Sequence, residues 1–353
     1  MARALQLARR GMYTTRPNPR VGCVIVNDNV IVGEGWHVKA GTDHAEIIAL
    51  KQAGKKARGA TCYVSLEPCA HTGRTPPCTG ALIETGIAKV IAAMVDPNPR
   101  VAGNGLSILN KSGIEALSGL LETEANTLNP GFIKRMRTGM PYVRCKLAMS
   151  LDGKTALESG ESKWITGPQS RRDVQRLRAG SCAVVTGTGT VLTDDPGLTV
   201  RDINEIPGQP IRVVLDRRLR FPVNAKMLEQ PGRTIIFTEN SDQVRRETLI
   251  RKGAEVIVVD DKGFLAFCLR YLAQHNEVNE VLVEAGPTLA GSMIKYGLVD
   301  ELILYQAPAI LGDRARSLFA LPGIERMEDR INVKLFDLRQ VGDDLRFIYH
   351  FNN

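Results

Sequence analysis

The sequence predicts an α/β protein with two domains, and three observations support this prediction. The chain has 353 residues, whereas a single domain usually has about 100–200. Short Val- and Ile-rich runs alternate with helical stretches, a pattern that indicates mostly parallel sheets covered by helices. This pattern restarts at Thr138-Gly139-Met140-Pro141. We therefore expect a first domain over residues 1–140 and a second over residues 141–353.

In the first half, apolar periodicity and cap residues define the expected elements. Helices are predicted over residues 2–11, 44–54, 78–86, 101–113 and 115–137. Strands are predicted over residues 21–26, 30–36, 60–66 and 89–96, the first two joined as a hairpin by Asn27-Asp28-Asn29. Asp43 is expected to cap the second helix, and Asn129-Pro130 to form a cap and first-turn pair.

In the second half, short β-branched runs predict the strands of a second sheet. They cover residues 141–150, 182–187, 210–216, 233–238, 254–260 and 280–286, with a helix over residues 170–180. Three late strands are predicted over residues 301–311, 333–341 and 344–351, and we expect them to be antiparallel. The second domain is therefore predicted as a mainly parallel sheet with late antiparallel strands.

Composition and charge restrict the class of protein and of partner. Hydrophobic residues make up 43% of the chain and charged residues 24%, which is ordinary for a soluble globular protein. No run of 18 apolar residues occurs, so no membrane span is expected. The net charge of +8 suits either nucleic acid or small phosphorylated molecules. Because Lys and Arg are spread along the chain and aromatic residues reach only 5%, we favour small anionic ligands and expect no nucleic-acid partner.

The cysteines indicate a reducing compartment. The seven cysteines are odd in number and widely scattered, which argues against a disulfide framework. The basic N-terminal stretch has no apolar segment followed by a cleavage site, so it is interpreted as a first helix, not as a secretory signal. We therefore expect a cytoplasmic protein.

Three short motifs carry the ligands of a metal site. His44 opens a predicted helix, Cys69 follows a strand within Glu67-Pro68-Cys69, and Cys78 opens another helix. One imidazole and two thiolates leave the fourth position of tetrahedral zinc to water, which is the arrangement of a catalytic site. A closed, purely structural zinc site stays open as an alternative, with His71 as the fourth ligand.

Glu46 has the position that hydrolytic deamination requires. It lies two residues after His44, where it is able to take a proton from activated water and pass it to a leaving amine. Nucleobase deaminases combine His-x-Glu with Pro-Cys-x-x-Cys. Here eight residues separate Cys69 from Cys78, so the chain departs from that spacing.

Other candidate residues have weaker local signals. Asn18, in a turn between two prolines, serves either to hydrogen-bond a pyrimidine or to stabilise the turn. His37 follows a strand, and we favour a structural role for it. In the second half, residues 284–291 follow a strand and open a helix, where backbone N–H groups suit a phosphate, although a plain strand-to-helix turn is the alternative. The common dinucleotide fingerprint Gly-x-Gly-x-x-Gly, followed by an acidic residue, is missing.

These motifs resemble those of the bifunctional deaminase/reductases of bacterial riboflavin biosynthesis. The resemblance rests on residues 17–22, 44–46 and 67–78, with the long spacer between the cysteines, and in the second half on residues 146–154, 162–166, 191–196 and 283–289. It extends over essentially the whole chain. It implies a cytidine-deaminase-like three-layer α/β/α domain, followed by a dihydrofolate-reductase-like α/β domain.

The resemblance also implies the reactions and the cofactors. The substrate would be 2,5-diamino-6-ribosylamino-4(3H)-pyrimidinone 5′-phosphate, which the first domain deaminates with one Zn²⁺ per chain. The second domain would then reduce the ribosyl group to ribityl with NADPH. We expect no membrane partner, and we expect a homo-oligomer.

Residue roles follow from the same resemblance. The pyrimidine would face Asn18, His44, Glu46 and His71, and the second substrate site would comprise Ser162, Arg178, Leu198, Arg201 and Glu284, with the two arginines on its phosphate. NADPH would contact Ala148, Trp164, Thr190, Asp194, Gly286, Pro287, Thr288, Leu289, Ala290, Gly291 and Ser292.

Three of these second-domain residues keep a competing interpretation. Asp194 is expected in a loop after a strand, where it supplies or relays the proton for reduction or simply caps a turn. Lys146, alternating with apolar neighbours, points either to the substrate or to the sheet edge. Trp164 has a packing role as its alternative.

Two other function classes remain open from the residues. One is a nucleoside or nucleic-acid deaminase with an appended binding domain, which the zinc motif would equally serve. The other is a non-catalytic zinc-stapled regulatory or nucleic-acid-binding protein, in which Glu46 would have no chemical role.

Overall fold

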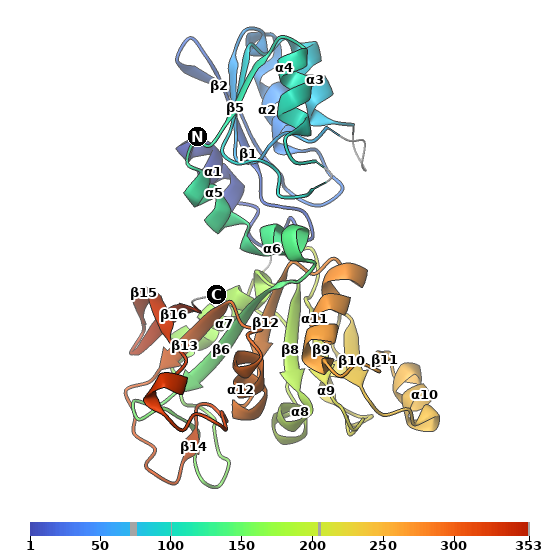
Figure 1. Cartoon of the computed structure of the whole chain (residues 1–353), viewed down its shortest axis with the longest axis vertical. Helices are drawn as coiled ribbons and strands as arrows, with labels where there is room; N and C mark the ends of the chain where they lie inside the picture. The colour runs from blue at the N-terminus through green and yellow to red at the C-terminus, as the bar shows by residue number, and fades with distance from the viewer. Residues whose placement is uncertain (71–75, 100, 204–205, 352–353) are drawn as a thin grey trace. The chain divides into compact units, whose positions relative to one another are not determined.

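The computed structural model describes residues 1–70, 76–99, 101–203 and 206–351 (Figure 1). By its internal contacts the chain divides into two compact units, Met1–Met140 and Pro141–Asn353. Within the described residues, every helix is too short or too polar to cross a lipid bilayer.

The first unit is built on a five-stranded sheet with the order β2-β1-β3-β4-β5. Its strands are β1 (Gly22–Asn27), β2 (Val30–Trp36), β3 (Thr61–Val64), β4 (Lys89–Ala92) and β5 (Glu115–Ser118). Strand β1 is antiparallel to β2 and β3, whereas β3, β4 and β5 run parallel. Its helices are α1 (Ala2–Arg9), α2 (Ala45–Ala53), α3 (Cys78–Thr85), α4 (Asn104–Lys111), α5 (Glu122–Leu128) and α6 (Pro130–Thr138), with a 3₁₀ turn over Gly54–Ala57.

The sheet of the first unit lies between two layers of helices (Figure 1), and successive side chains of β1 point to one layer and then to the other. Cys23 and Ile25 face the core beneath α2, α3 and α4, whereas Val24 packs with Ala4 and Leu7 of α1 on the other face. This arrangement confirms the predicted three-layer α/β/α domain.

The predicted helix over residues 115–137 is wrong at its start. Residues 115–118 form the edge strand β5, in which only Ala116 is buried. Two contacts hold this segment extended. It pairs with β4, and the Asn110 side chain bonds both the N–H and the C=O of Ala116. Asn129 and Pro130 occupy the N-cap position and the first turn of α6 as predicted, but the Asn129 side chain makes no capping hydrogen bond and instead bonds the backbone N–H and C=O of Arg20.

The second unit contains a nine-stranded sheet with the order β11-β10-β9-β8-β12-β6-β13-β16-β15. Its strands are β6 (Tyr142–Met149), β8 (Ala183–Gly187), β9 (Ile211–Leu215), β10 (Thr234–Thr238), β11 (Ala254–Val258), β12 (Glu280–Glu284), β13 (Glu301–Gln306), β15 (Val333–Val341) and β16 (Asp344–Phe351), and a separate ribbon pairs β7 (Lys154–Ala156) with β14 (Arg316–Ser317). The helices are α7 (Pro168–Ala179), α8 (Thr188–Asp194), α9 (Lys226–Glu229), α10 (Gln243–Arg251), α11 (Phe264–His275) and α12 (Pro287–Lys295), with a 3₁₀ turn over Met327–Asp329.

Helices cover both faces of this sheet. Ile236 of β10 packs on one face in a cluster with Leu249 of α10, whereas the next residue, Phe237, meets the Tyr271 ring of α11 on the other face. Two expectations are corrected. The late strands pair antiparallel with one another as predicted, β13 with β16 and β16 with β15, but β13 also runs parallel to β6 on its other side. Asp194 does not lie in a loop as expected. It is the last residue of the short helix α8, which begins directly after β8.

Candidate active sites

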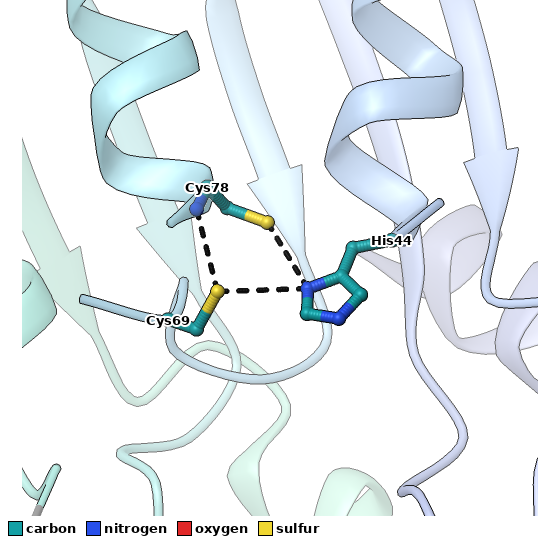
Figure 2. A group of neighbouring side chains, drawn as sticks. All are labelled: His44, Cys69 and Cys78. Atoms are coloured by element: carbon teal, nitrogen blue, oxygen red, sulfur yellow. Dashed lines mark hydrogen bonds between the residues drawn. The ribbon is translucent and has the colours of Figure 1, made fainter. Parts of the chain in front are cut away.

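Three side chains from separate elements of the first unit converge on one point (Figure 2). His44 precedes α2, Cys78 is the first residue of α3, and Cys69 lies in the segment after β3. His44 Nδ1 is 3.2 Å from Cys78 Sγ and 3.5 Å from Cys69 Sγ. A tetrahedral zinc with bonds of about 2.0 Å to nitrogen and about 2.3 Å to sulfur spaces its ligands roughly 3.5–3.8 Å apart. The donor set therefore fits zinc.

The charge state of the Cys69 thiol also suits a metal. Hydrogen bonds from Cys78 and from His44 lower the pKa of the Cys69 thiol against the opposing effect of burial. The backbone N–H of Cys78 also donates to Cys69 Sγ, at 3.3 Å. Thiolate is the form of cysteine that binds zinc. His71, the fourth ligand of the closed-site alternative, lies outside the described residues.

Glu46 is buried in the first turn of α2, with 3% of its surface exposed. Burial, followed by the charge of Cys69, raises the pKa of its carboxyl to about 7. A group whose pKa lies near the working pH both takes and gives a proton efficiently. The side chain is thus placed beside the metal ligands with the properties of a proton carrier.

Asn18 and His37 form a hydrogen-bonded pair next to the metal ligands. His37 Nδ1 lies 3.1 Å from the carbonyl oxygen of Asp43, to which it donates, so its Nε2 accepts from Asn18 Nδ2 at 3.0 Å. The rings of His37 and His44 meet edge to face, with centroids 5.4 Å apart. This pairing directs the amide N–H₂ of Asn18 to His37, so a substrate would meet its carbonyl oxygen.

Glu67 organises the segment that carries Cys69, a role that the motif Glu67-Pro68-Cys69 does not reveal by itself. Its buried carboxylate accepts backbone N–H groups from Asp96 and Gly103 at 3.0 and 2.9 Å, and from Gly105 and Leu106 at 2.8 and 3.2 Å. These bonds fix the Glu67-Pro68-Cys69 segment against the start of α4. The sequence shows only that an acidic residue follows an apolar strand and directly precedes Pro68-Cys69.

The second unit contains a cavity of about 1600 Å³. It lies where the parallel strands β6, β8, β9 and β12 end, the edge at which α/β sheets bind ligands. Of the predicted residues, its lining includes Lys146, Ala148, Ser162, Trp164, Arg178, Thr190, Asp194, Leu198, Arg201, Glu284, Gly286, Pro287, Thr288, Leu289 and Ser292.

Two predicted NADPH contacts are not part of this lining. Ala290 is fully buried. A side chain at Gly291 would come within 2.2 Å of the carbonyl oxygen of Ala320, so this residue serves close packing. Both lie on the packed side of α12, whereas Thr288 and Ser292, one helical turn apart, lie on the side that lines the cavity.

A buried ion pair forms one wall of the cavity. Arg178 Nε and Nη2 donate to the two carboxylate oxygens of Glu284 at 2.5 and 3.0 Å, and Nη1 donates to the carbonyl oxygen of Thr199 at 2.9 Å. Arg178 therefore directs its donors to protein groups, whereas Arg201 is exposed and has no acidic partner within the described chain. Of the two predicted phosphate ligands, Arg201 is the one whose guanidinium is available.

Lys146 and Trp164 occupy contrasting positions in the cavity. Lys146 is enclosed, and burial lowers its pKa while the nearby charge of Glu284 opposes that shift. Its Nζ lies 5.9 Å from the centroid of the Tyr305 ring. Trp164 is 70% exposed, with the Arg171 guanidinium over its ring at 4.6 Å, so the packing alternative for Trp164 is wrong.

The comparisons with known proteins agree with both sites. Residues 1–94 match the family model of the cytidine and deoxycytidylate deaminase zinc-binding region, and residues 141–347 match that of the RibD C-terminal domain. The riboflavin biosynthesis protein RibD of Escherichia coli is 50% identical over 98% of this chain and 96% of its own length. The RibD protein of Aquifex aeolicus is 42% identical over 98% and 96%.

Solved structures give the same result. Acinetobacter baumannii RibD superimposes with a TM-score of 0.94 at 47% identity, covering 100% of this chain and 98% of that one. A diaminohydroxyphosphoribosylaminopyrimidine deaminase/5-amino-6-(5-phosphoribosylamino)uracil reductase from Thermotoga maritima superimposes with a TM-score of 0.88 at 34% identity, covering 99% and 97%.

These matches decide against the two other function classes, the deaminase with an appended binding domain and the non-catalytic zinc-stapled protein. The second half matches the RibD C-terminal domain, and RibD relatives match almost the whole chain. The predicted fold class is confirmed for both halves. The chain belongs to the RibD family of bifunctional riboflavin-biosynthesis enzymes, which combine a zinc-dependent deaminase domain with an NADPH-dependent reductase domain.

Proposed function

We propose that residues 1–140 remove the 2-amino group of 2,5-diamino-6-ribosylamino-4(3H)-pyrimidinone 5′-phosphate, and that residues 141–353 reduce the ribosyl group of the product to ribityl. The observation that carries this proposal is the convergence of His44, Cys69 and Cys78 beside the buried carboxyl of Glu46. The name of the Thermotoga maritima relative specifies the same two reactions for that protein.

In the deaminase site, His44, Cys69 and Cys78 would hold the zinc. When bound there, zinc activates water as a nucleophile at neutral pH. Glu46 takes a proton from the attacking water and delivers it to the departing nitrogen, so that ring carbon C2 gains oxygen and ammonia leaves. The carbonyl oxygen of Asn18, oriented by His37, accepts a hydrogen bond from the pyrimidine.

In the reductase site, NADPH supplies a hydride to C1′ of the opened ribose when it is bound. The protein has to orient the substrate and provide one proton. Lys146 stands beside Glu284 and Arg178 with a lowered pKa, which suits proton delivery at neutral pH. Asp194 faces the same cavity and is the second candidate for this role, and Arg201 would pair with the 5′-phosphate.

The state and location of the protein are also proposed. Leu335, Phe336 and Leu338 of the edge strand β15 are exposed apolar side chains, which supports a homo-oligomer that buries them. All seven cysteines are free thiols, which supports a cytoplasmic location. Light scattering of the purified chain would test the first proposal, with a monomeric mass as the contradicting result.

A split assay tests the proposed function. Ammonia release is followed with the diaminopyrimidine phosphate, and NADPH oxidation is followed separately with pre-deaminated substrate. Glu46→Gln is expected to abolish ammonia release and leave NADPH oxidation intact. Lys146→Ala and Asp194→Ala, which remove the two candidates for the reductase proton, are expected to show the reverse. Loss of both activities in each variant would contradict two separate sites.

A further inference from the structure

A tight turn presents two arginines to the cavity at the end of β9. The turn is closed by a hydrogen bond of 3.0 Å from the N–H of Leu219 to the carbonyl oxygen of Asp216. Leu219 has a φ of 53° and its side chain is 1% exposed, so it anchors the turn in the core. Arg217 and Arg218, the two central residues, are exposed and line the cavity.

The backbone of this turn is held on several sides. The carbonyl oxygen of Arg217 accepts from the N–H of Glu239 at 3.2 Å, and that of Arg218 accepts from Asn240 Nδ2 at 3.2 Å. Arg245 of α10 donates to the carbonyl oxygen of Leu219 and, at 3.0 Å, to that of Phe221. The positions of both arginine backbones are therefore fixed before any ligand binds.

The side chains differ in their partners. Arg217 lies over the Phe264 ring at 5.0 Å, and its Nε is 3.3 Å from a Glu239 carboxylate oxygen. Arg218 and Arg220 have no acidic partner within the part of the chain that the structure describes. Lys226 and Lys262 also line the cavity. We call Arg217, Arg218, Arg220, Lys226 and Lys262 the β9 cation cluster.

The acidic residue at the end of β9 is not available to a ligand. In NAD-dependent folds, an Asp or Glu at a strand end binds the free 2′-hydroxyl of the adenosine ribose, whereas a nearby Arg accommodates a 2′-phosphate. Asp216 is 2% exposed, and its Oδ2 accepts the N–H of Phe221 at 2.7 Å. Because Asp216 is turned inward, the end of β9 presents arginines that suit a phosphate, and the Asp216 carboxylate is not available to a ribose hydroxyl.

The location of the cluster matches the far end of a dinucleotide. Strands β9 and β6 are separated by β8 and β12, which places them roughly 14 Å apart at the usual strand spacing. The substrate-side residues Lys146 and Glu284 belong to β6 and β12. Between the two ends, Gly286 at the N-terminus of α12 lines the cavity and suits a pyrophosphate.

We propose that Arg218, flanked by Arg217 and Arg220, binds the 2′-phosphate of NADPH and makes the reductase select NADPH over NADH. This inference rests on the proposed function, because it assumes that this cavity holds the nucleotide. The planar guanidinium of Arg218 donates two N–H groups to phosphate oxygens, a charge-assisted contact for which NADH has no counterpart.

Direct binding of the two nucleotides tests the proposal without catalysis. The fluorescence of the reduced nicotinamide is titrated with wild-type chain and with Arg218→Ala, in the absence of substrate. Arg218→Ala is expected to raise the Kd of NADPH about tenfold or more, because the loss of a hydrogen bond to a charged group typically weakens binding by about that factor. The Kd of NADH is expected to change by less than about twofold, which also shows that the variant is folded.

Two further variants complete the design. Arg251→Ala, an exposed arginine of α10 outside the cavity lining, serves as the matched control and is expected to leave both Kd values unchanged. The double variant Arg217→Ala/Arg218→Ala is expected to abolish most of the preference. Calorimetry with 2′,5′-ADP, which retains only the adenosine end, is expected to show the same loss for Arg218→Ala.

The outcomes separate the two levels of inference. Wild-type binding of NADPH and NADH with equal Kd, or an unchanged preference in the double variant, would overturn the phosphate subsite while the proposed function stands. Failure of the wild-type chain to bind NADPH and 2′,5′-ADP at all would overturn the proposed reductase site together with the subsite.

Discussion

Individual side chains of the deaminase site depend on residues that do not touch the metal. His37 accepts the Asn18 amide and is itself fixed by the carbonyl oxygen of Asp43. Burial lowers the pKa of His37, so it remains neutral and keeps the lone pair that this contact requires. In our account His37 is a positioning residue, which acts on the substrate only through Asn18.

A double-mutant cycle tests this role. Asn18→Ala and His37→Ala are each expected to lower kcat/KM for ammonia release by about 10- to 100-fold, and the double variant should be no worse than Asn18→Ala alone. Zinc content should remain at one per chain in all three variants. His275→Ala, on an exposed helix end, is the control. Multiplicative losses would show that His37 acts independently of Asn18.

The Arg178–Glu284 pair makes stability depend on pH. Burial alone raises the pKa of the Glu284 carboxyl, but the charge and hydrogen bonds of Arg178 outweigh burial and hold it below its ordinary value. A carboxyl whose pKa is lowered by folding adds stability above its unfolded-state pKa of about 4.3. That contribution is lost as the pH falls through the folded-state pKa.

Glu284→Gln removes this contribution. At pH 7 the free energy of unfolding is expected to fall by about 3–5 kcal/mol, because Arg178 is left buried without a counter-charge. The difference from wild type should shrink below about pH 4, as urea unfolding at both pH values would show. Glu255→Gln breaks an exposed pair with Arg233 and should cost less than about 1 kcal/mol. Equal effects of the two substitutions would contradict the account.

Single elements of the first unit pack through close backbone approaches. A side chain at Gly22 of β1 would come within 2.0 Å of the carbonyl oxygen of Ala4 and 2.6 Å of the backbone nitrogen of Ala8, both in α1. Glycine there lets α1 lie directly on the sheet. By contrast, Gly80 of α3 has open space around its Cβ position and no positive φ.

Replacing glycine by alanine should therefore change the free energy of unfolding in opposite directions at Gly22 and Gly80. Gly22→Ala is expected to lower the free energy of unfolding by about 1–3 kcal/mol, since α1 must shift. Gly80→Ala is expected to raise it by about 0.5–1 kcal/mol, because alanine loses less backbone entropy in a helix. Denaturant unfolding of the zinc-loaded chain measures both, and a neutral Gly22→Ala would show that α1 is loosely docked.

At the level of elements, the sequence predicts what depends on local pattern. Local signals include the apolar runs of β8, β9, β10, β11 and β12 and the helix start at Asn129-Pro130, and the structure confirms these elements. Strand β5 has no local signal, because its conformation depends on pairing with β4 and on Asn110. The parallel direction of β13 is likewise set by its pairing with β6, which is distant in the sequence.

Across the whole molecule, motifs reveal chemistry where the ligand atoms belong to the motif itself. His44, Cys69 and Cys78 could be predicted together because zinc requires those atoms. The role of Glu67 and the pairing of Arg178 with Glu284 depend on contacts between distant segments, which spacing does not encode. The residues alone likewise do not predict the proposed preference for NADPH over NADH, because it depends on the Asp216 side chain being turned inward.

The central claim is that the first unit holds zinc with three protein ligands and an open fourth position. X-ray absorption at the zinc edge of the zinc-loaded chain measures this coordination directly. We predict one zinc per chain, with two sulfur neighbours at about 2.3 Å, one imidazole nitrogen and one further light atom at about 2.0 Å. A second imidazole in the first shell would make the site closed and structural, and would contradict the account.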